Sequence, residues 1–151
     1  MTRPKKERMV KIPPLFSSFK PTGVRQMDLK ITELSLDEYE AIRLTDYLGL
    51  DHSEAAEKME ISRSTFSRLI EKARKKVASF MIEGTALNIQ GGNIHFRGNL
   101  IQCQDCGFVF NTDFNNEINS CPNCNSHNLK DLARTFGHGK CCRNRKSRNR
   151  R

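Results

Sequence analysis

Residues 52–71 read HSEAAEKMEISRSTFSRLIE, and this stretch decides the fold of the first half of the chain. Two capping residues mark helix starts in it: Asp51, just before the stretch, precedes a short helical segment that ends near Met59, and Ser62 precedes a longer one. The longer helix is predicted over residues 63–82 and stops before a glycine. Its apolar residues recur at helical spacing and form one stripe, which we expect to be core: Phe66, Leu69, Ile70, Ala73, Val77, Phe80 and Met81.

A third helix is predicted upstream over residues 36–48, because Ser35 and Glu38 form a capping box and Gly49 provides a stop. The short and long segments then make a helix-turn-helix, in which the second helix can lie in the major groove of DNA. Glu60 stands at the turn position where such motifs usually have glycine. A positive φ at this residue would cost on the order of 1 kcal/mol.

The face of the long helix opposite the apolar stripe is polar and mostly basic, and it presents Ser64, Ser67, Arg68, Glu71, Lys72 and Lys75. Its first turns can reach base edges, while lysines further along can reach phosphates. The residues predicted to contact bases are Arg63, Ser64, Thr65, Ser67 and Arg68, and those predicted to contact phosphates are Lys72, Lys75 and Lys76. Three-helix units of this pattern also mediate protein contacts without touching DNA, and that interpretation stays open.

Residues 34–76, LSLDEYEAIRLTDYLGLDHSEAAEKMEISRSTFSRLIEKARKK, resemble the helix-turn-helix of the sigma-factor region that reads the promoter −35 element. With FKPTG before it and EGTALNIQGG after it, the chain more specifically resembles the prokaryotic family known as domain of unknown function 134. The resemblance covers about residues 1–96 and is specific through EAAEKM, SRSTF and ARKKVA. Members of that family are described as DNA-binding proteins without an established target, so the resemblance implies DNA binding.

Two Cys-x-x-Cys pairs, Cys103 with Cys106 and Cys121 with Cys124, form the clearest chemical motif of the second half. Each pair resembles a knuckle that directs two thiolates at one ion, and two knuckles complete the tetrahedral Cys₄ site of a structural zinc. Short strands are predicted around the pairs at LIQ, FVF and NLKDL, which makes the segment similar to a zinc ribbon. A rubredoxin-like iron site uses the same four ligands and is the alternative to zinc.

The remaining histidines and cysteines have no assigned role. His127 and His138 are candidate ligands only if one of the four cysteines is not used. Cys141 and Cys142, together with His138, could hold a second metal or act as redox-sensitive thiols. The simpler alternative is that these two cysteines are free thiols in a basic tail.

The composition favours small folded units with polar ends: 151 residues carry a net charge of +9, and only 36% are hydrophobic. We expect a mostly α N-terminal helix-turn-helix domain plus a small β zinc ribbon, with basic extended termini. The predicted boundaries are a Pro-containing arm over 1–30, the helical domain over 31–90, a linker or Gly91-Gly92 hairpin over 91–98, the ribbon over 99–135 and a tail over 136–151. The basic charge lies in the arm, the long helix and the tail.

These features predict a DNA-binding transcriptional regulator that reads the major groove with the helix starting at Arg63. No catalytic constellation is recognisable, so no enzymatic activity is expected. The sequence has no apolar run long enough for a membrane span or secretory signal, which predicts a cytoplasmic protein without a membrane partner. The alternatives are an RNA- or ribosome-associated zinc-ribbon protein and an adaptor that contacts RNA polymerase; a homodimer on paired half-sites also stays open.

Overall fold

A computed structural model describes residues 7–138 of the chain, which fall into two compact units. The first unit contains residues 7–9 and 16–94, and the second contains residues 10–15 and 95–138. The chain passes between the units three times: within β1 (Arg8–Val10), between residues 15 and 16, and within β5 (Ile94–Phe96). β1 and β5 pair with each other. Each unit is described by itself below.

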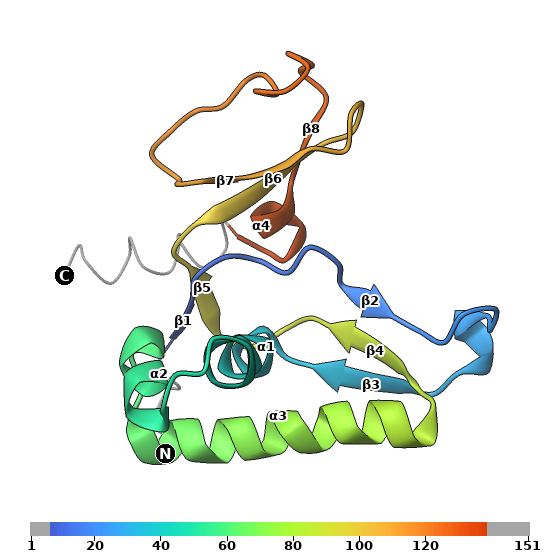
Figure 1. Ribbon diagram of the computed structural model, residues 1–151, viewed down its shortest axis with the longest axis vertical. Helices are drawn as coiled ribbons and strands as arrows, with labels where there is room; N and C mark the ends of the chain where they lie inside the picture. Colours follow the sequence, from blue (N-terminus) through green and yellow to red (C-terminus); the bar gives the residue numbers. More distant parts are fainter. Residues whose placement is uncertain (1–6, 139–151) are drawn as a thin grey trace. The chain divides into compact units, whose positions relative to one another are not determined.

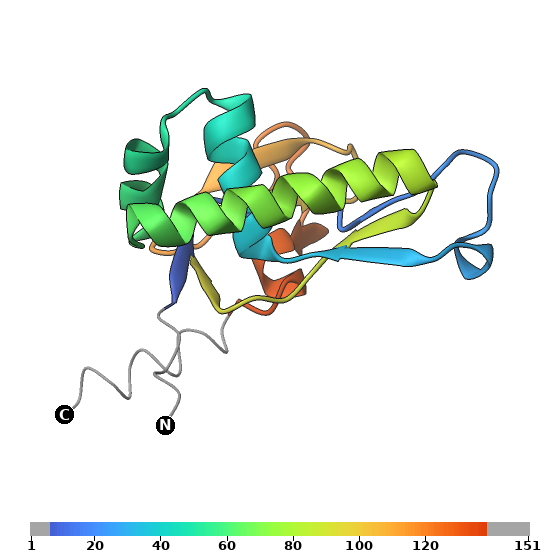
Figure 2. The same cartoon turned by 90° about the horizontal axis from the view of Figure 1, so that it is seen from below.

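The helices of the first unit begin where the capping residues predict. α1 (Leu36–Ile42) starts at a capping box of Ser35 and Glu38 and continues into the π-helical turn η2 (Arg43–Tyr47). The side chain of Asp51 caps α2 (His52–Met59). The hydroxyl of Ser62 accepts the amide of Thr65 at the start of α3 (Arg63–Glu83), the long green helix that crosses Figure 2. The sequence-based ranges of all three helices are therefore confirmed to within a residue or two.

A small apolar core joins these helices. Met59 and Phe66 are completely buried, and Ala55 and Ala56 lie where α2 approaches α3. The alanines carry no side chain beyond Cβ, so the two helices can pack closely. The buried core residues are Ala41, Leu44, Ala55, Ala56, Met59, Phe66, Leu69 and Ile70. The apolar stripe predicted for α3 thus lies against α1, η2 and α2 over its first half.

The turn between α2 and α3 has the left-handed backbone that its sequence position predicts. Glu60 has φ 57° and ψ 41°, and it ends α2 by donating its amide to the carbonyl of Glu57. A residue with a Cβ is disfavoured in this conformation, whereas glycine adopts it freely.

We expect Glu60→Gly to raise the free energy of unfolding of the first unit by about 0.5–1 kcal/mol, because it removes this strain. Urea denaturation followed by tyrosine emission measures the change, since both tyrosines, Tyr39 and Tyr47, belong to this unit. Glu57→Gly, in the exposed interior of α2, is the matched control and should cost about 1 kcal/mol. Equal losses in both variants would contradict the strain argument.

The first unit also contains a three-stranded sheet, and this corrects the expectation of a mostly α domain. β2 (Ser18–Phe19), β4 (Ala86–Ile89) and β3 (Ile31–Leu34) form the sheet in that order. β3 runs parallel to β4, and β2 runs antiparallel to β4 (Figure 1). The 3-10 turn η1 (Gln26–Asp28) lies between β2 and β3. Much of the segment predicted as an extended arm is thus part of this unit.

The hairpin alternative around Gly91 and Gly92 is wrong. β4 and β5 flank the two glycines but pair with other strands: β4 with β2 and β3, and β5 with β1. Both glycines have positive φ, 77° and 97°, so they do turn the backbone between the strands. The carbonyl of Gly91 accepts the amide of Leu36 at 3.0 Å, which ties this link to the start of α1.

The second unit is built on an antiparallel sheet in the order β7-β6-β8. Its strands are β6 (Asn99–Cys103), β7 (Val109–Thr112) and β8 (Leu129–Asp131), and the short α4 (Leu132–Thr135) follows β8. Asn99 is buried and donates to Asp131 at 2.7 Å while accepting the amide of Ala133 at 2.9 Å. This side chain therefore fixes α4 against the sheet.

Within residues 7–138, no helix combines the length and the apolar character that crossing a bilayer requires.

Candidate nucleic-acid interface and metal centre

Five of the eight residues predicted to contact DNA are exposed on α3: Arg63, Ser64, Arg68, Lys72 and Lys75. At 100° per residue, Ser64, Arg68, Lys72 and Lys75 lie on one side of the helix, opposite the buried Phe66 and Ile70. The capped start of α3, next to the turn from α2, holds the first two of the five. The structure thus brings Ser64, Arg68, Lys72 and Lys75 to one solvent-facing side of α3, whereas Arg63 is exposed on a different side of the helix.

The other three predicted residues make contacts within the fold. The hydroxyl of Ser67 lies 2.9 Å from Nδ1 of His52, which joins α3 to the first turn of α2. Thr65 is half-buried, and its hydroxyl accepts that of Ser62 at 2.7 Å. The ammonium group of Lys76 lies 2.7 Å from the buried carboxylate of Glu38. That Thr65, Ser67 and Lys76 contact DNA stays a prediction.

The cations of α3 divide into two groups. Arg74 forms an ion pair with Asp46 at 2.7 Å, and the hydrogen bond to that carboxylate raises the pKa of Arg74. Lys76 forms the pair with Glu38. By contrast, the four remaining cations of the helix form no ion pair within residues 7–138, although the exposed Glu71 lies one turn from two of them: these cations are Arg63, Arg68, Lys72 and Lys75. Their charge is available for an external anion.

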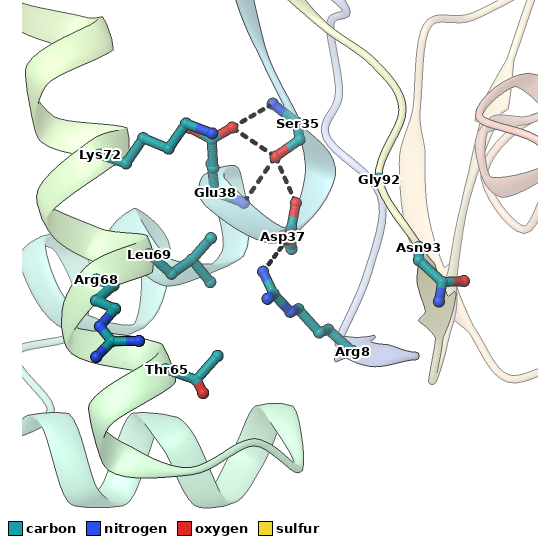
Figure 3. A pocket seen from close by; sticks show the side chains of 10 residues that line it. All are labelled: Arg8, Ser35, Asp37, Glu38, Thr65, Arg68, Leu69, Lys72, Gly92 and Asn93. Atoms are coloured by element: carbon teal, nitrogen blue, oxygen red, sulfur yellow. Dashed lines mark hydrogen bonds and ion pairs between the residues drawn. The ribbon is translucent and has the colours of Figure 1, made fainter. Parts of the chain in front are cut away.

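A groove of about 470 Å³ lies beside this surface in the first unit. Thr65, Arg68, Leu69 and Lys72 of α3 form one wall, and Figure 3 shows Arg8 and the first turn of α1 facing them. The remaining lining residues are Ser35, Asp37, Glu38, Gly92 and Asn93.

Sequence reasoning did not find this groove. Ser35 and Glu38 are predicted as a helix cap and Arg8 as part of an arm, and all three lie too far from α3 along the chain for a local pattern to connect them. Asp37 was the one available signal: an acidic residue in the first turn of α1 offers a partner for a distant arginine. Arg8 does form an ion pair with Asp37.

The four cysteines of the two pairs converge at one end of the β6 sheet. Their Sγ atoms all lie within 4.8 Å of one another. The Sγ atoms of Cys103 and Cys124 are 3.5 Å apart, and those of Cys106 and Cys121 are 3.6 Å apart. Four sulfurs at 2.3 Å from a tetrahedral zinc would be separated by about 3.8 Å. The cluster therefore fits one tetrahedral metal ion.

The surroundings of the cluster favour the thiolate at Cys106, whereas burial and the neighbouring cysteine side chains raise the pKa of Cys124. The side chain of Asn123 donates to Sγ of Cys106, and this bond, with the backbone amide of Phe108, lowers the pKa of Cys106 to about 6. The amide of Asn123 donates to Sγ of Cys121 at 3.4 Å. Deprotonated sulfur is the form that binds metal, so these bonds prepare the site for an ion.

A second set of contacts connects the two knuckles without using sulfur. Asp105, between the first two cysteines, accepts the hydroxyl of Ser126 and the side-chain amide of Asn128. Both hydrogen bonds lower the pKa of Asp105, and the bond from Ser126 has the larger effect. Through these bonds the carboxylate holds the second knuckle beside the first.

The histidines lie outside the cysteine cluster. Nδ1 of His127 is 2.6 Å from the carbonyl of Asn119, and the ring of His138 stacks on Phe114 with centroids 3.9 Å apart. Burial lowers the pKa of His138. Among the described residues, the metal-ligand group consists of the four cysteines alone. Cys141 and Cys142, with most of the predicted tail, lie outside the described residues.

Comparison with known families gives one match that covers most of the chain. The model of the family "Protein of unknown function DUF134" matches residues 1–97. The chain belongs to the DUF134 family. This confirms the family resemblance of the first half, and the match includes the whole α1–α3 region and β4.

Relatives of this DUF134 chain extend the similarity beyond the part that the family model covers. A UPF0251 protein of Chloroherpeton thalassium is 47% identical over 150 residues, which is 99% of each chain. UPF0251 proteins of Clostridium novyi and Pelotomaculum thermopropionicum are 37% and 43% identical; they cover 94% and 83% of this chain and 97% and 95% of their own. The similarity to the first two therefore spans both units. No solved structure matches the chain.

Proposed function

We propose that the chain binds double-stranded DNA, with α3 in the major groove and α2 across the backbone. The observation that carries the proposal is the set of four unpaired cations, Arg63, Arg68, Lys72 and Lys75, on the exposed part of a helix whose other cations are paired. A helix of this kind fits a groove about 12 Å wide. Phosphates supply the missing counter-charges, and releasing their condensed ions favours binding.

The positions along α3 suggest different roles for the exposed residues. Arg63, Ser64 and Arg68 lie in the first two turns and can reach base edges, where an arginine grips guanine through two hydrogen bonds. Lys72 and Lys75 lie a turn or more further along and would neutralise phosphates. Because such contacts give sequence preference, we propose regulation of transcription as the role of the protein.

We expect Arg68→Ala to lose about 1–3 kcal/mol of binding free energy on a selected DNA site and much less on random DNA. Lys72→Ala should weaken binding about equally on both DNAs and reduce the salt dependence by about one phosphate contact. Fluorescence anisotropy at several salt concentrations measures both effects. Arg74→Ala is the matched control, because the guanidinium of Arg74 is held by Asp46.

Two results would contradict the proposal. Equal losses for Arg68→Ala on both DNAs would remove base recognition by α3. Tighter binding of structured RNA than of duplex DNA at matched salt would favour the RNA-associated alternative.

We also propose that the four-cysteine cluster holds one structural zinc. All four ligands are sulfur and their spacing suits a tetrahedron, so the protein fills every coordination position and leaves none for a substrate. The ion would stabilise the second unit, whose three short strands and single turn of helix enclose few apolar side chains.

A further inference from the structure

The groove beside α3 has the size and the chemistry of a site for a small anion. We propose that this groove binds the phosphoryl group of a free phosphate ester of nucleotide size, held by Arg68 and Lys72, in competition with DNA. Its volume of about 470 Å³ lies within the range of small-molecule sites, which is roughly 300–1,000 Å³. The competition rests on the proposed DNA binding, whereas binding of the ester does not.

The charges of the groove are positive once its internal ion pairs are counted. Asp37 is neutralised by Arg8 and also accepts the hydroxyl of Ser35. Glu38 is neutralised by Lys76 at 2.7 Å, and its Oε1 also lies 2.7 Å from the Ser35 hydroxyl, whose single proton the two carboxylates share. Both carboxylates are buried and each forms one ion pair, so their net charge toward a ligand is small, although Oε2 of Glu38 makes no hydrogen bond within the described residues.

The uncompensated charges are those of Arg68 and Lys72. Neither makes an ion pair or hydrogen bond with any other part of residues 7–138. They are four residues apart on α3, so their side chains emerge from the same face one turn apart and can meet on one group. A phosphoryl group suits this pair, because the guanidinium gives two parallel hydrogen bonds and the ammonium adds a point charge.

The rest of the groove favours a free ester over inorganic phosphate. Thr65 accepts the Ser62 hydroxyl with its own oxygen, which leaves the Thr65 proton available for a phosphate oxygen. Leu69 lines the same wall between Arg68 and Lys72 (Figure 3) and offers an apolar contact. A phosphate carrying an organic body of nucleotide size would use both the cationic pair and this surface.

Occupation of the groove would oppose DNA binding through shared residues. Arg68 is proposed to contact a base of DNA, and Lys72 a phosphate. These two side chains cannot hold the phosphoryl group of a free ester while they contact DNA. A backbone phosphate offers the same chemistry, so the experiment must separate free from polymeric phosphate.

The direct test uses adenosine monophosphate as the probe and the full, metal-loaded chain, with no DNA present. We expect the amide signals of Thr65, Leu69 and Asn93 to shift in ¹H–¹⁵N spectra at constant ionic strength, and adenosine to shift them much less. Arg68→Gln and Lys72→Gln should each weaken the probe about tenfold or more. Arg68→Lys should retain part of the affinity, because it keeps the charge but loses the planar fork.

Lys75→Gln is the matched control, since Lys75 is an unpaired cation on the same side of α3 but does not line the groove. If Lys75→Gln weakens the probe as much as Arg68→Gln does, the attraction is diffuse and the proposal is overturned. It is also overturned if adenosine and adenosine monophosphate shift the same amides equally.

A second measurement separates this proposal from the proposed function. Adenosine monophosphate should displace a fluorescent duplex at constant ionic strength from the wild-type chain. If the duplex binds but the probe leaves the Thr65 and Leu69 amides unshifted, the groove proposal fails and DNA binding stands. If the probe binds in the groove while no duplex binds the chain, DNA binding fails and the phosphate site stands.

Discussion

Cys103→Ser is expected to abolish both metal binding and the fold of the second unit. Cys103 is buried at the end of β6, and its Sγ lies 3.5 Å from that of Cys124. Binding of structural zinc contributes about 10–16 kcal/mol in small domains, far more than a short three-stranded sheet can supply from its own core. Metal analysis should fall from one ion per chain to none, and the amide signals of β6–β8 should collapse to random-coil positions.

Two controls make this result specific. The double variant Cys141→Ser, Cys142→Ser should keep one ion per chain, because the four-cysteine cluster is complete without those thiols. Tyrosine emission should still report a folded first unit in Cys103→Ser, since Tyr39 and Tyr47 both lie there. Full retention of metal by Cys103→Ser, or two ions per wild-type chain, would contradict the proposed single Cys₄ site.

Phe66→Ala should destabilise the first unit by about 3–5 kcal/mol, because it removes a large side chain from the middle of the helical core. Phe66 is 0% exposed, packs with α1 and α2, and meets the ring of His52 edge to face at 5.4 Å. Urea denaturation followed by tyrosine emission measures the loss.

Ile82→Ala is the control for replacing a large apolar residue of α3 with alanine at an exposed position. Ile82 lies on the same helix but is 85% exposed, so its replacement should change the free energy of unfolding by less than about 0.5 kcal/mol. A loss for Phe66→Ala no larger than that for Ile82→Ala would mean that this residue does not hold the helices together.

The parts of the molecule that sequence predicted well are governed by local signals. Ser35, Asp51 and Ser62 each cap a helix as expected, because a short polar side chain next to an apolar periodicity has few other uses. The positive φ of Glu60 follows from its place at the end of α2. The clustering of the four cysteines follows from two pairs at knuckle spacing.

The three-stranded sheet could not be predicted in the same way. β2 has two residues and β3 and β4 have four each, too short for a clear alternation. Ile31 pairs with Ala86 across the entire helical region, so the partner of each strand is invisible to any local pattern. From the sequence, residues 91–98 are therefore predicted only as a linker or a hairpin, and the partners of β4 are not predicted.

The ion pairs of the lysines on α3 could not be predicted from the sequence either. Lys72, Lys75 and Lys76 are predicted together as phosphate contacts, because all three lie further along the helix than the residues predicted to contact bases. Only Lys76 reaches Glu38, and that depends on how α1 crosses α3. Position along a helix thus predicted exposure, but which cations stay unpaired is decided by packing between helices.

The parallel pairing of β3 with β4 has a consequence for how the first unit folds. The strand before α1 and the strand after α3 hydrogen-bond to each other, with Leu34 opposite Ile89, so they enclose all three helices in one closed loop. Closing a loop of this length costs entropy before its contacts form, which slows folding even when each helix forms readily. A fragment that begins at α1 and ends at α3 therefore lacks the closure, and we expect its helices to associate loosely.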